Sequence, residues 1–507
     1  MLRWLWKHDM NMTWTALALW LALAAQTVTA ASSDCARLRD VAIENATVTA
    51  VELVPEGPYK IRQGPRETSI DLPRHCRVAA LLTPSEDSHI EMELWLSLDW
   101  NGKFLVVGNG GWAGSISYRA LAAGLREGYA AASNDTGHQD RGASFVMGHP
   151  EKLIDFAYRA MHEMTVQSKK LVRSFYQKEI QLSYYEGCST GGRQGLMAAQ
   201  RYPEDFDGVI AGAPANPMTE KHLGDAERSR QAHRDRKNLL SPAQLRLVHQ
   251  AAVEACDSRD GVEDGLLTDP SACSFDPAKL LCEGGEPAYG CLTAGQLESV
   301  GAAYEPVNDQ NGDLIYAGYS PGSEMSWRFL LDGSSGVGTA LDTFRYAVHG
   351  DPDWNWDQFD LTRDRRLALE RAGILNASSD LAGFRARGGK MILYHGWVDG
   401  AIVAQNTVIY HAEVEERLGG DQRDWLRLFM VPGMGHCGGG EGPDQVNWLA
   451  GLERWVEAKK TPERITAHRV RNNRVELTRP LCPYPAVAKW SGVGSVTDEA
   501  NFQCVEP

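Results

Sequence analysis

A serine flanked by glycines is the strongest chemical signal in the sequence. Residues 187–191 read Gly-Cys-Ser-Thr-Gly, after the apolar run Ile180–Tyr185 and before a helical pattern over Arg193–Tyr202. A sharp strand-to-helix turn of this kind exposes the serine hydroxyl, and glycines tolerate the crowding around it. The five-residue pattern alone often arises by chance, but strand, turn and helix together indicate that Ser189 is a nucleophile.

A serine nucleophile needs a general base and a residue that orients the base. On α/β sheets with such a serine turn, the acid follows the serine along the chain and the histidine comes last. Asp399 lies just past the apolar run Met391–Tyr394, and His436 follows the run Leu428–Val431. We therefore expect Ser189 to attack, His436 to act as the base and Asp399 to orient it.

Two other histidines are weaker candidates for the base. His395 precedes the acid in the chain, and His411 falls within a predicted helix between Ile402 and Leu418. His436 lies in the loop after the last predicted strand, where the base of this arrangement is expected.

A tetrahedral intermediate at Ser189 also needs two converging N–H groups. The amide of Thr190 directly follows the serine, and Gly111 lies in the glycine-rich loop Asn109–Trp112. A glycine loop lets the backbone approach an oxyanion closely, so both amides are candidate donors. The alternative is that the glycines merely end a strand.

The elements that would position these residues are short apolar runs that alternate with helical patterns. This alternation is typical of an α/β fold, with a largely parallel sheet covered by helices. Each run ends in a glycine-bearing loop, where open α/β sheets place their sites. The runs are Phe104–Val107, Tyr129–Ala132, Ile180–Tyr185, Gly208–Ala211, Met391–Tyr394 and Leu428–Val431.

The alternation breaks between about residues 218 and 385. This stretch holds four cysteines, acidic turns and Gly/Pro-rich loops. We interpret residues 218–385 as a lid domain inserted into a catalytic domain made of residues 31–217 and 386–507.

One loop of the predicted lid has the composition of a cation site. Asp257, Asp260 and Asp264 are spaced three and four residues apart, with glycines at 261 and 265. Calcium takes six to eight oxygen ligands, which these carboxylates and the carbonyls of Val262 and Leu266 could supply. The spacing differs from that of an EF-hand, and a solvated acidic turn is the alternative.

The N-terminus reads as a secretory signal. Arg3 and Lys7 precede a short apolar run, Trp14–Ala25, and small residues end at Ala30. The run is shorter than the roughly 20 residues that span a bilayer. We therefore expect residues 1–30 to be removed, the protein to be secreted or periplasmic, and no membrane to be a partner.

All ten cysteines follow this signal, and an even number in an exported chain indicates five disulfides. Cys188 precedes the candidate nucleophile and Cys437 follows the candidate base, so a bridge between them would tie the two loops together and leave Cys35 with Cys76. The alternative is that Cys188 and Cys437 pair elsewhere. Short separations favour the remaining three pairs, which are Cys256 with Cys273, Cys282 with Cys291, and Cys482 with Cys504.

The charge balance excludes one class of function. The chain has 507 residues, with 51 Lys and Arg against 66 Asp and Glu, giving a formal charge of −15. Binding to nucleic acid through phosphate neutralisation requires the opposite balance, so we expect no nucleic-acid partner.

Taken together, these residues resemble the tannase and feruloyl esterase family. The resemblance rests on Gly187–Gly195, Arg201–Pro203, Asp207–Val209 and Gly212–Pro214, on His395-Gly396 with Asp399, and on Gly435–Cys437. It implies an α/β-hydrolase fold with a large lid, a Ser189–His436–Asp399 triad and the five cysteine pairs named above. It also implies structural calcium held by Asp257, Asp260, Val262, Asp264 and Leu266, and no organic cofactor.

The resemblance further implies a small aromatic carboxylic ester as substrate. The expected enzyme is a secreted serine carboxylesterase that hydrolyses hydroxycinnamoyl, feruloyl-type esters through an acyl-enzyme. Alternatives are a tannase acting on galloyl esters, a mono(2-hydroxyethyl) terephthalate hydrolase, and an inactive, calcium-stabilised extracellular binding protein. Ile402 stands where terephthalate-type relatives carry an aromatic residue, which disfavours that alternative. Trp327, Phe329 and Trp397 are possible pocket residues, and the oligomeric state stays open.

Overall fold

The computed structural model describes residues 34–63, 66–283, 290–331 and 338–506. The predicted signal peptide, residues 1–30, lies outside the described residues. None of the helices in the described residues is long and apolar enough to cross a membrane.

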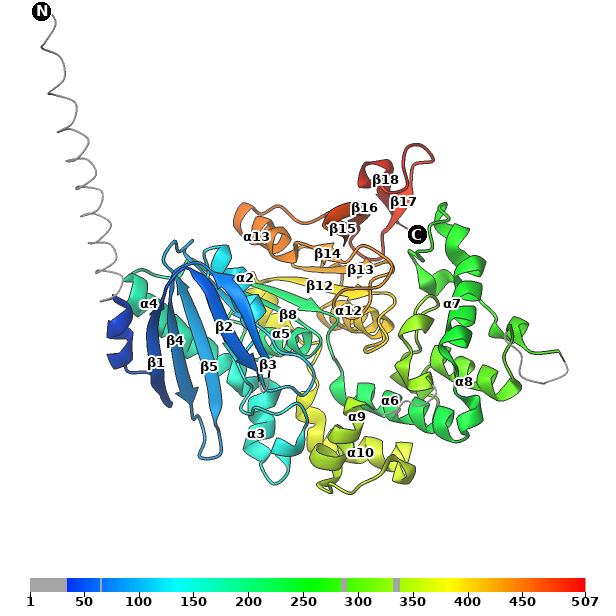
Figure 1. Ribbon diagram of the computed structural model, residues 1–507, viewed down its shortest axis with the longest axis horizontal. Coiled ribbons are helices and arrows are strands. Elements are labelled where there is room, and N and C mark those ends of the chain that lie inside the picture. Colours follow the sequence, from blue (N-terminus) through cyan, green and yellow to red (C-terminus); the bar gives the residue numbers. More distant parts are fainter. Residues whose placement is uncertain (1–33, 64–65, 284–289, 332–337, 507) are drawn as a thin grey trace, which may run out of the picture.

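A nine-stranded sheet forms the centre of the molecule (Figure 1). Its strand order is β1-β4-β5-β7-β6-β8-β9-β12-β13, and the six strands from β7 to β13 in that order run parallel. The predicted α/β fold is therefore confirmed. The six parallel strands are β6 Lys103–Val107, β7 Ala130–Asn134, β8 Leu182–Cys188, β9 Gly208–Gly212, β12 Lys390–Gly396 and β13 Leu426–Val431.

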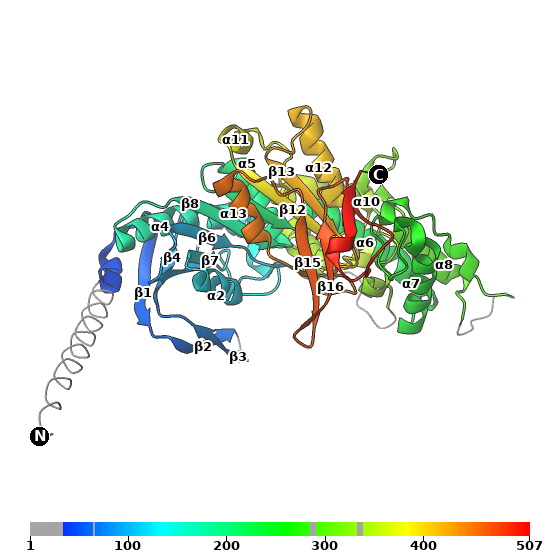
Figure 2. The same ribbon diagram turned by 90° about the horizontal axis from the view of Figure 1, so that it is seen from above.

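The remaining three strands were not predicted, and they pair antiparallel. They are β1 Ala46–Val54, β4 His75–Leu82 and β5 Ile90–Ser97, and β5 joins the parallel part through β7. A hairpin of β2 Gly57–Gln63 and β3 Arg66–Leu72 projects from this end of the sheet, with β3 against helix α2 (Figure 2).

Helices cover both faces of the sheet, and each face has its own apolar core. On one face pack α2 Tyr118–Arg126 and α13 Trp448–Ala458, which bury Leu121 and Leu452. The other face is covered by α4 Ala160–Tyr176, α5 Thr190–Arg201 and α12 Gln405–Leu418. The parallel strands are buried on both faces, which explains why they read as continuous apolar runs.

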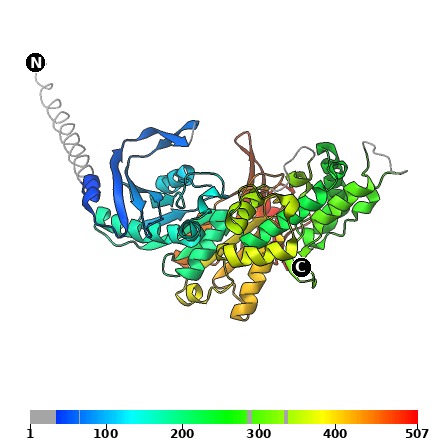
Figure 3. The same ribbon diagram turned by 90° about the horizontal axis from the view of Figure 1, so that it is seen from below.

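The chain between β9 and β12 forms a helical region with a separate core that includes Leu223, Trp327 and Phe344. Figures 1 and 3 show this region at the end of the molecule opposite β1. We refer to it as the lid. Its helices are α6 Met218–His233, α7 Pro242–Cys256, α8 Ala294–Tyr304, α9 Thr339–Asp342 and α10 Leu361–Ala372, and its strands are β10 Val307–Asn308 and β11 Leu314–Tyr316. The last helix of this stretch, α11 Ala382–Ala386, packs against α5 and buries Phe384 in the core of the central sheet.

The C-terminal segment adds two small sheets beside β13. The first contains β14 Gln445–Val446, β15 Ile465–Arg471 and β16 Arg474–Leu481. The second pairs β17 Val487–Trp490 with β18 Phe502–Val505, and the Cys482–Cys504 disulfide links them to the end of β16. Helix α3, Pro150–Ile154, lies between β7 and α4 in the chain.

Candidate active site

Ser189 lies at the sharp turn between β8 and α5. Its backbone has φ 65° and ψ −125°, a conformation that is strained for a residue with a side chain. A Cβ at Gly187 would come within 2.6 Å of the Gly191 backbone, so only glycine fits there. The flanking glycines thus allow the close passage of strand and helix that exposes the serine.

The structure brings the three predicted triad residues into one hydrogen-bonded chain. Ser189 Oγ lies 2.9 Å from Nε2 of His436, and Nδ1 of His436 lies 2.7 Å from Oδ2 of Asp399. Both distances fall in the range that proton transfer requires. The chain assembles because β8, β12 and β13, which end beside these residues, lie within a run of four adjacent parallel strands.

Asp399 is held as a buried carboxylate. Its Oδ1 accepts hydrogen bonds from the amides of Ala401 and Ile402, at 2.7 and 3.0 Å. Burial alone would raise the pKa of Asp399, but hydrogen bonds from His395 and His436, together with their charge, outweigh it and hold the pKa well below its usual value. The residue therefore stays ionised at neutral pH, as the orienting acid of a triad must.

The loop that carries Gly111 is fastened to the start of α5. Thr190 Oγ1 donates to the Gly111 carbonyl at 2.8 Å, and Gly111 itself has φ 60°. Asn109 exchanges hydrogen bonds with the Gln194 side chain, and its Nδ2 also donates to the carbonyls of Ser115 and Asn134. Among the described residues, no acceptor is bonded to the amides of Gly111 and Thr190, so both N–H groups remain available for an oxyanion.

One disulfide lies directly beside the candidate triad. The Cys188–Cys437 bridge joins the residue before Ser189 to the residue after His436. Cys437 has φ 61°, and Gly438, Gly439 and Gly440 also have positive φ. The bridge thus anchors the glycine-rich loop after His436, which we call the histidine loop, to the serine turn.

The other four predicted disulfides are also present, and they lie away from the triad. In the lid, Cys282 pairs with Cys291 across a separation of 9 residues, and the buried Cys282 donates its amide to the Leu292 carbonyl at 2.9 Å. Each of the four bridges therefore fastens a local segment rather than the site. The four are Cys35–Cys76, Cys256–Cys273, Cys282–Cys291 and Cys482–Cys504.

The acidic loop of the lid is ordered mainly by its own backbone amides. Asp257 Oδ2 accepts from the Gly265 amide at 2.9 Å, and Asp260 accepts from Val262 and Thr268. Asp264 accepts from the Leu266 amide and pairs with Arg479 at 2.5 Å. Burial, with the nearby charge of Asp264, raises the pKa of both Asp257 and Asp260.

Two observations bear on calcium in this loop. Asp257 Oδ1 is buried without a hydrogen-bond partner, which leaves an oxygen free for a cation. Against this, no group of three or more His, Cys, Asp or Glu side chains in the described parts of the chain is arranged to hold a metal ion. The donor chemistry suits calcium, and Arg479 occupies one oxygen of the set.

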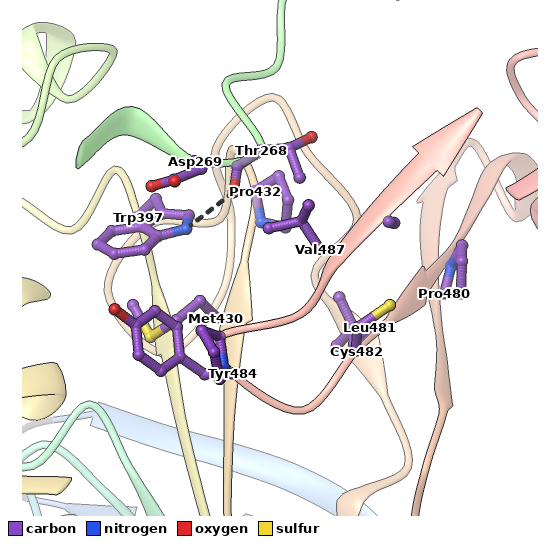
Figure 4. A pocket seen from close by; sticks show the side chains of 12 residues that line it. Thr268, Asp269, Trp397, Met430, Pro432, Pro480, Leu481, Cys482, Tyr484 and Val487 are labelled. Atoms are coloured by element: carbon purple, nitrogen blue, oxygen red, sulfur yellow. Dashed lines mark hydrogen bonds between the residues drawn. The ribbon is translucent and has the colours of Figure 1, made fainter. Parts of the chain in front are cut away.

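The three aromatic pocket candidates have different environments. Trp327 is fully buried in the lid core and donates to Ser323 Oγ. Trp397 donates to the Thr268 carbonyl at 3.1 Å and lines a small cavity of about 50 Å³ between the lid, β13 and the C-terminal segment (Figure 4). Only Phe329 lines the cleft that holds His436.

That cleft has a volume of about 490 Å³, within the range of small-molecule sites. The histidine loop and Gly400 form one side, and α6 with Tyr319 and Phe329 forms the other. Tyr319 and Phe329 are stacked with ring centroids 5.6 Å apart. Lys221 and Asp225, 2.6 Å apart on α6, add a polar pair to the lining.

The sequence pattern does not predict several residues of the cleft and of the Asp399 environment. Tyr319, Lys221 and Asp225 carry no local signal, because only the packing of the lid brings them to the cleft. The sequence marked His395 as a weaker candidate base and as part of the family resemblance, but not as a partner of Asp399. Their spacing of four residues does not by itself predict the contact.

A parallel sheet with a serine at a strand-to-helix turn, a histidine and an acid on neighbouring strand ends defines an α/β-hydrolase. Similarity to known proteins narrows the class further. The family model described as "Tannase and feruloyl esterase" matches residues 76–336 and 342–505. The chain therefore belongs to the tannase and feruloyl esterase family and is a carboxylic ester hydrolase of that type.

Individual relatives agree with this assignment. The chain is 36% identical to an uncharacterised esterase of Xanthomonas campestris, covering 95% of this chain and 93% of that protein. It is 34% identical to the probable feruloyl esterase B-2 of Aspergillus oryzae, covering 95% and 98%. The crystal structure of feruloyl esterase B from Aspergillus oryzae superposes with a TM-score of 0.88 at 30% identity, covering 94% and 100%.

Proposed function

We propose that the chain is a serine esterase that hydrolyses aromatic carboxylic esters through an acyl-enzyme. Ser189 Oγ attacks the ester carbonyl while His436 Nε2 takes its proton, and the amides of Gly111 and Thr190 donate to the oxyanion. His436 then protonates the leaving alcohol. Water, activated by the same histidine, releases the acid and restores Ser189.

The observation that carries this proposal is the hydrogen-bonded chain from Ser189 through His436 to Asp399. A binding protein on the same fold would have no need to keep all three groups in this geometry. Replacing Ser189 with Ala tests the proposal, because the hydroxyl contributes chemistry rather than packing. We expect kcat to fall by about three orders of magnitude or more with folding unchanged. Retention of more than about a tenth of the activity would refute the assignment.

For the acid half of the substrate we propose a hydroxycinnamoyl, feruloyl-type group. The support is the stacked Tyr319–Phe329 pair in the cleft, which offers an aromatic wall, and the resemblance to feruloyl esterases. Values of kcat/KM for methyl ferulate, methyl caffeate, methyl gallate and chlorogenate test this choice. The highest value for methyl gallate would favour the tannase alternative.

Two further properties are proposed with this function. We propose calcium as a structural ion in the lid, with Asp257, Asp260, Asp264 and the carbonyls of Val262 and Leu266 as ligands; the support is the partnerless oxygen of Asp257 and the oxygen-rich donor set. We also propose export to the periplasm or the medium. Its support is the N-terminal sequence pattern and the five disulfides, which persist in oxidising compartments.

A further inference from the structure

A second histidine contacts the candidate acid. His395 Nε2 lies 3.0 Å from Oδ2 of Asp399, the same oxygen that receives Nδ1 of His436. His395 sits at the carboxyl end of β12 and is fully buried. Asp399 therefore accepts hydrogen bonds from two imidazoles and from two backbone amides.

The surroundings fix which atom of His395 donates to Asp399. Its Nε2 also lies 3.2 Å from the Ile402 carbonyl, which can only accept a hydrogen bond. Because both neighbours of Nε2 are acceptors, that nitrogen carries a proton. Nδ1 lies 2.7 Å from the Thr407 hydroxyl, which holds the ring from its other side.

This arrangement affects the charge that His436 meets. The N–H of His395 withdraws part of the negative charge of Asp399 Oδ2, and it fixes the carboxylate where His436 can reach it. Tyr319 from the lid also faces Asp399, and its hydroxyl donates to the Gly400 carbonyl at 3.3 Å. The charged side chains that line the cleft with His436 are Lys221, Asp225, Arg228 and Arg328. Within the described residues, His395 is the side chain besides His436 that hydrogen-bonds to the Asp399 carboxylate.

We infer that His395 is a positioning residue, which orients Asp399 through its Nε2–H and tempers the basicity that Asp399 confers on His436. The inference rests on the proposed Ser189–His436–Asp399 mechanism. It has a signature that a merely structural histidine lacks. Without this donor, Asp399 would present more negative charge to His436 and would stabilise the protonated imidazole. The acidic limb of the profile of kcat/KM against pH should therefore move to higher pH.

The test compares kcat/KM against pH for methyl ferulate in the full-length protein and three variants. His395→Leu removes the donor. His395→Gln keeps an amide N–H near the position of Nε2. His411→Gln is the matched control, because His411 is also a buried histidine, lies on α12 with Thr407, and pairs with Glu415 rather than Asp399.

We expect His395→Leu to move the acidic limb upward by roughly half to one pH unit, to lower kcat about tenfold and to leave KM within about twofold. His395→Gln should bring both the acidic limb and kcat most of the way back to the wild-type values, and His411→Gln should change neither. An acidic limb that is unchanged or lower in His395→Leu would overturn the inference, as would a Gln variant no better than Leu.

A second variant tests the role of His395 if His395→Leu does not fold. If circular dichroism shows that His395→Leu is unfolded, Thr407→Val removes only the hydroxyl that supports Nδ1. It should move the limb in the same direction by a smaller amount, and an unmoved limb would overturn the inference. Ser189→Ala separates the two proposals. Residual activity in Ser189→Ala refutes the triad. If Ser189→Ala is inactive but the acidic limb of His395→Leu does not move, only the role of His395 is refuted.

Discussion

Replacing both Cys188 and Cys437 with Ala should reduce turnover by more than the lost stability explains. The bridge closes a separation of 249 residues, which the chain-entropy model equates with about 5 kcal/mol of stabilisation. It also connects two loops with positive φ, at Ser189 and Cys437, to each other. Without it, the glycine-rich histidine loop has fewer constraints on its distance from Ser189.

The size of the catalytic effect follows from the Ser189–His436 distance. The present separation of 2.9 Å allows direct proton transfer, and a displacement of about 1 Å typically costs about 100-fold in rate. We therefore expect kcat of the folded double variant to fall between about 10- and 100-fold. KM should change little, because the lid side of the cleft is untouched.

The assay measures turnover of methyl ferulate well below the melting midpoint of the variant, with the folded fraction checked by circular dichroism. The matched control is the variant lacking the Cys35–Cys76 bridge, which closes 41 residues at the far edge of the sheet and should cost about 4 kcal/mol. The control should melt earlier and keep its kcat. Full turnover in the folded Cys188/Cys437 variant would show that the bridge is a tether without a positional role.

Three further outcomes are expected. Thr190→Val removes the hydroxyl that holds the Gly111 carbonyl, so kcat should fall about tenfold with KM unchanged, and an undiminished kcat would exclude this role. EDTA should lower the melting midpoint and calcium should restore it, whereas Asp257→Asn should respond to neither; a wild-type melting curve indifferent to both would reduce the loop to an acidic turn. Burial lowers the pKa of His138 from 6.5 to about 4, so between these pH values only the unfolded chain binds the proton and the free energy of unfolding falls as pH falls. In urea titrations, His138→Gln should lose stability less steeply over that window, and equal slopes would contradict the burial argument.

The chemistry of the site was predictable because each of its residues lies in the loop after a buried strand. Ser189, Asp399 and His436 follow the ends of β8, β12 and β13, which the parallel sheet places close together, so sequence order and strand pattern were sufficient to group them. The cysteine pairs could be inferred for a similar reason, since Cys188 and Cys437 are direct neighbours of two of these residues. The remaining pairs, such as Cys282 with Cys291, close short loops.

The residues that sequence reasoning missed depend on packing between distant segments. Trp327 and Phe329 are two positions apart and equally aromatic, yet one is core and the other lines the cleft. The antiparallel strands β1, β4 and β5 lack a continuous apolar run. β1 and β4 are half-buried with a mixed pattern, and β5 is buried but carries Glu91 and Glu93 between its apolar residues. The effect of His395 on Asp399 depends on side-chain orientation, which spacing alone does not determine.

The separation of the lid from the sheet has a consequence for specificity. The groups proposed for the chemistry lie on the sheet, whereas Tyr319 and Phe329 of the cleft lie on the lid. Hydrogen bonds connect the lid with the segment around Asp399 at several points. Tyr319 donates to the Gly400 carbonyl and Trp397 to the Thr268 carbonyl, and the Val403 amide donates to the Tyr316 hydroxyl. Lid substitutions that spare these contacts can therefore change the preferred acid while the Ser189–His436–Asp399 geometry stays intact. Substitutions at Tyr319 should instead alter kcat and KM together, because that residue both lines the cleft and contacts the acid loop.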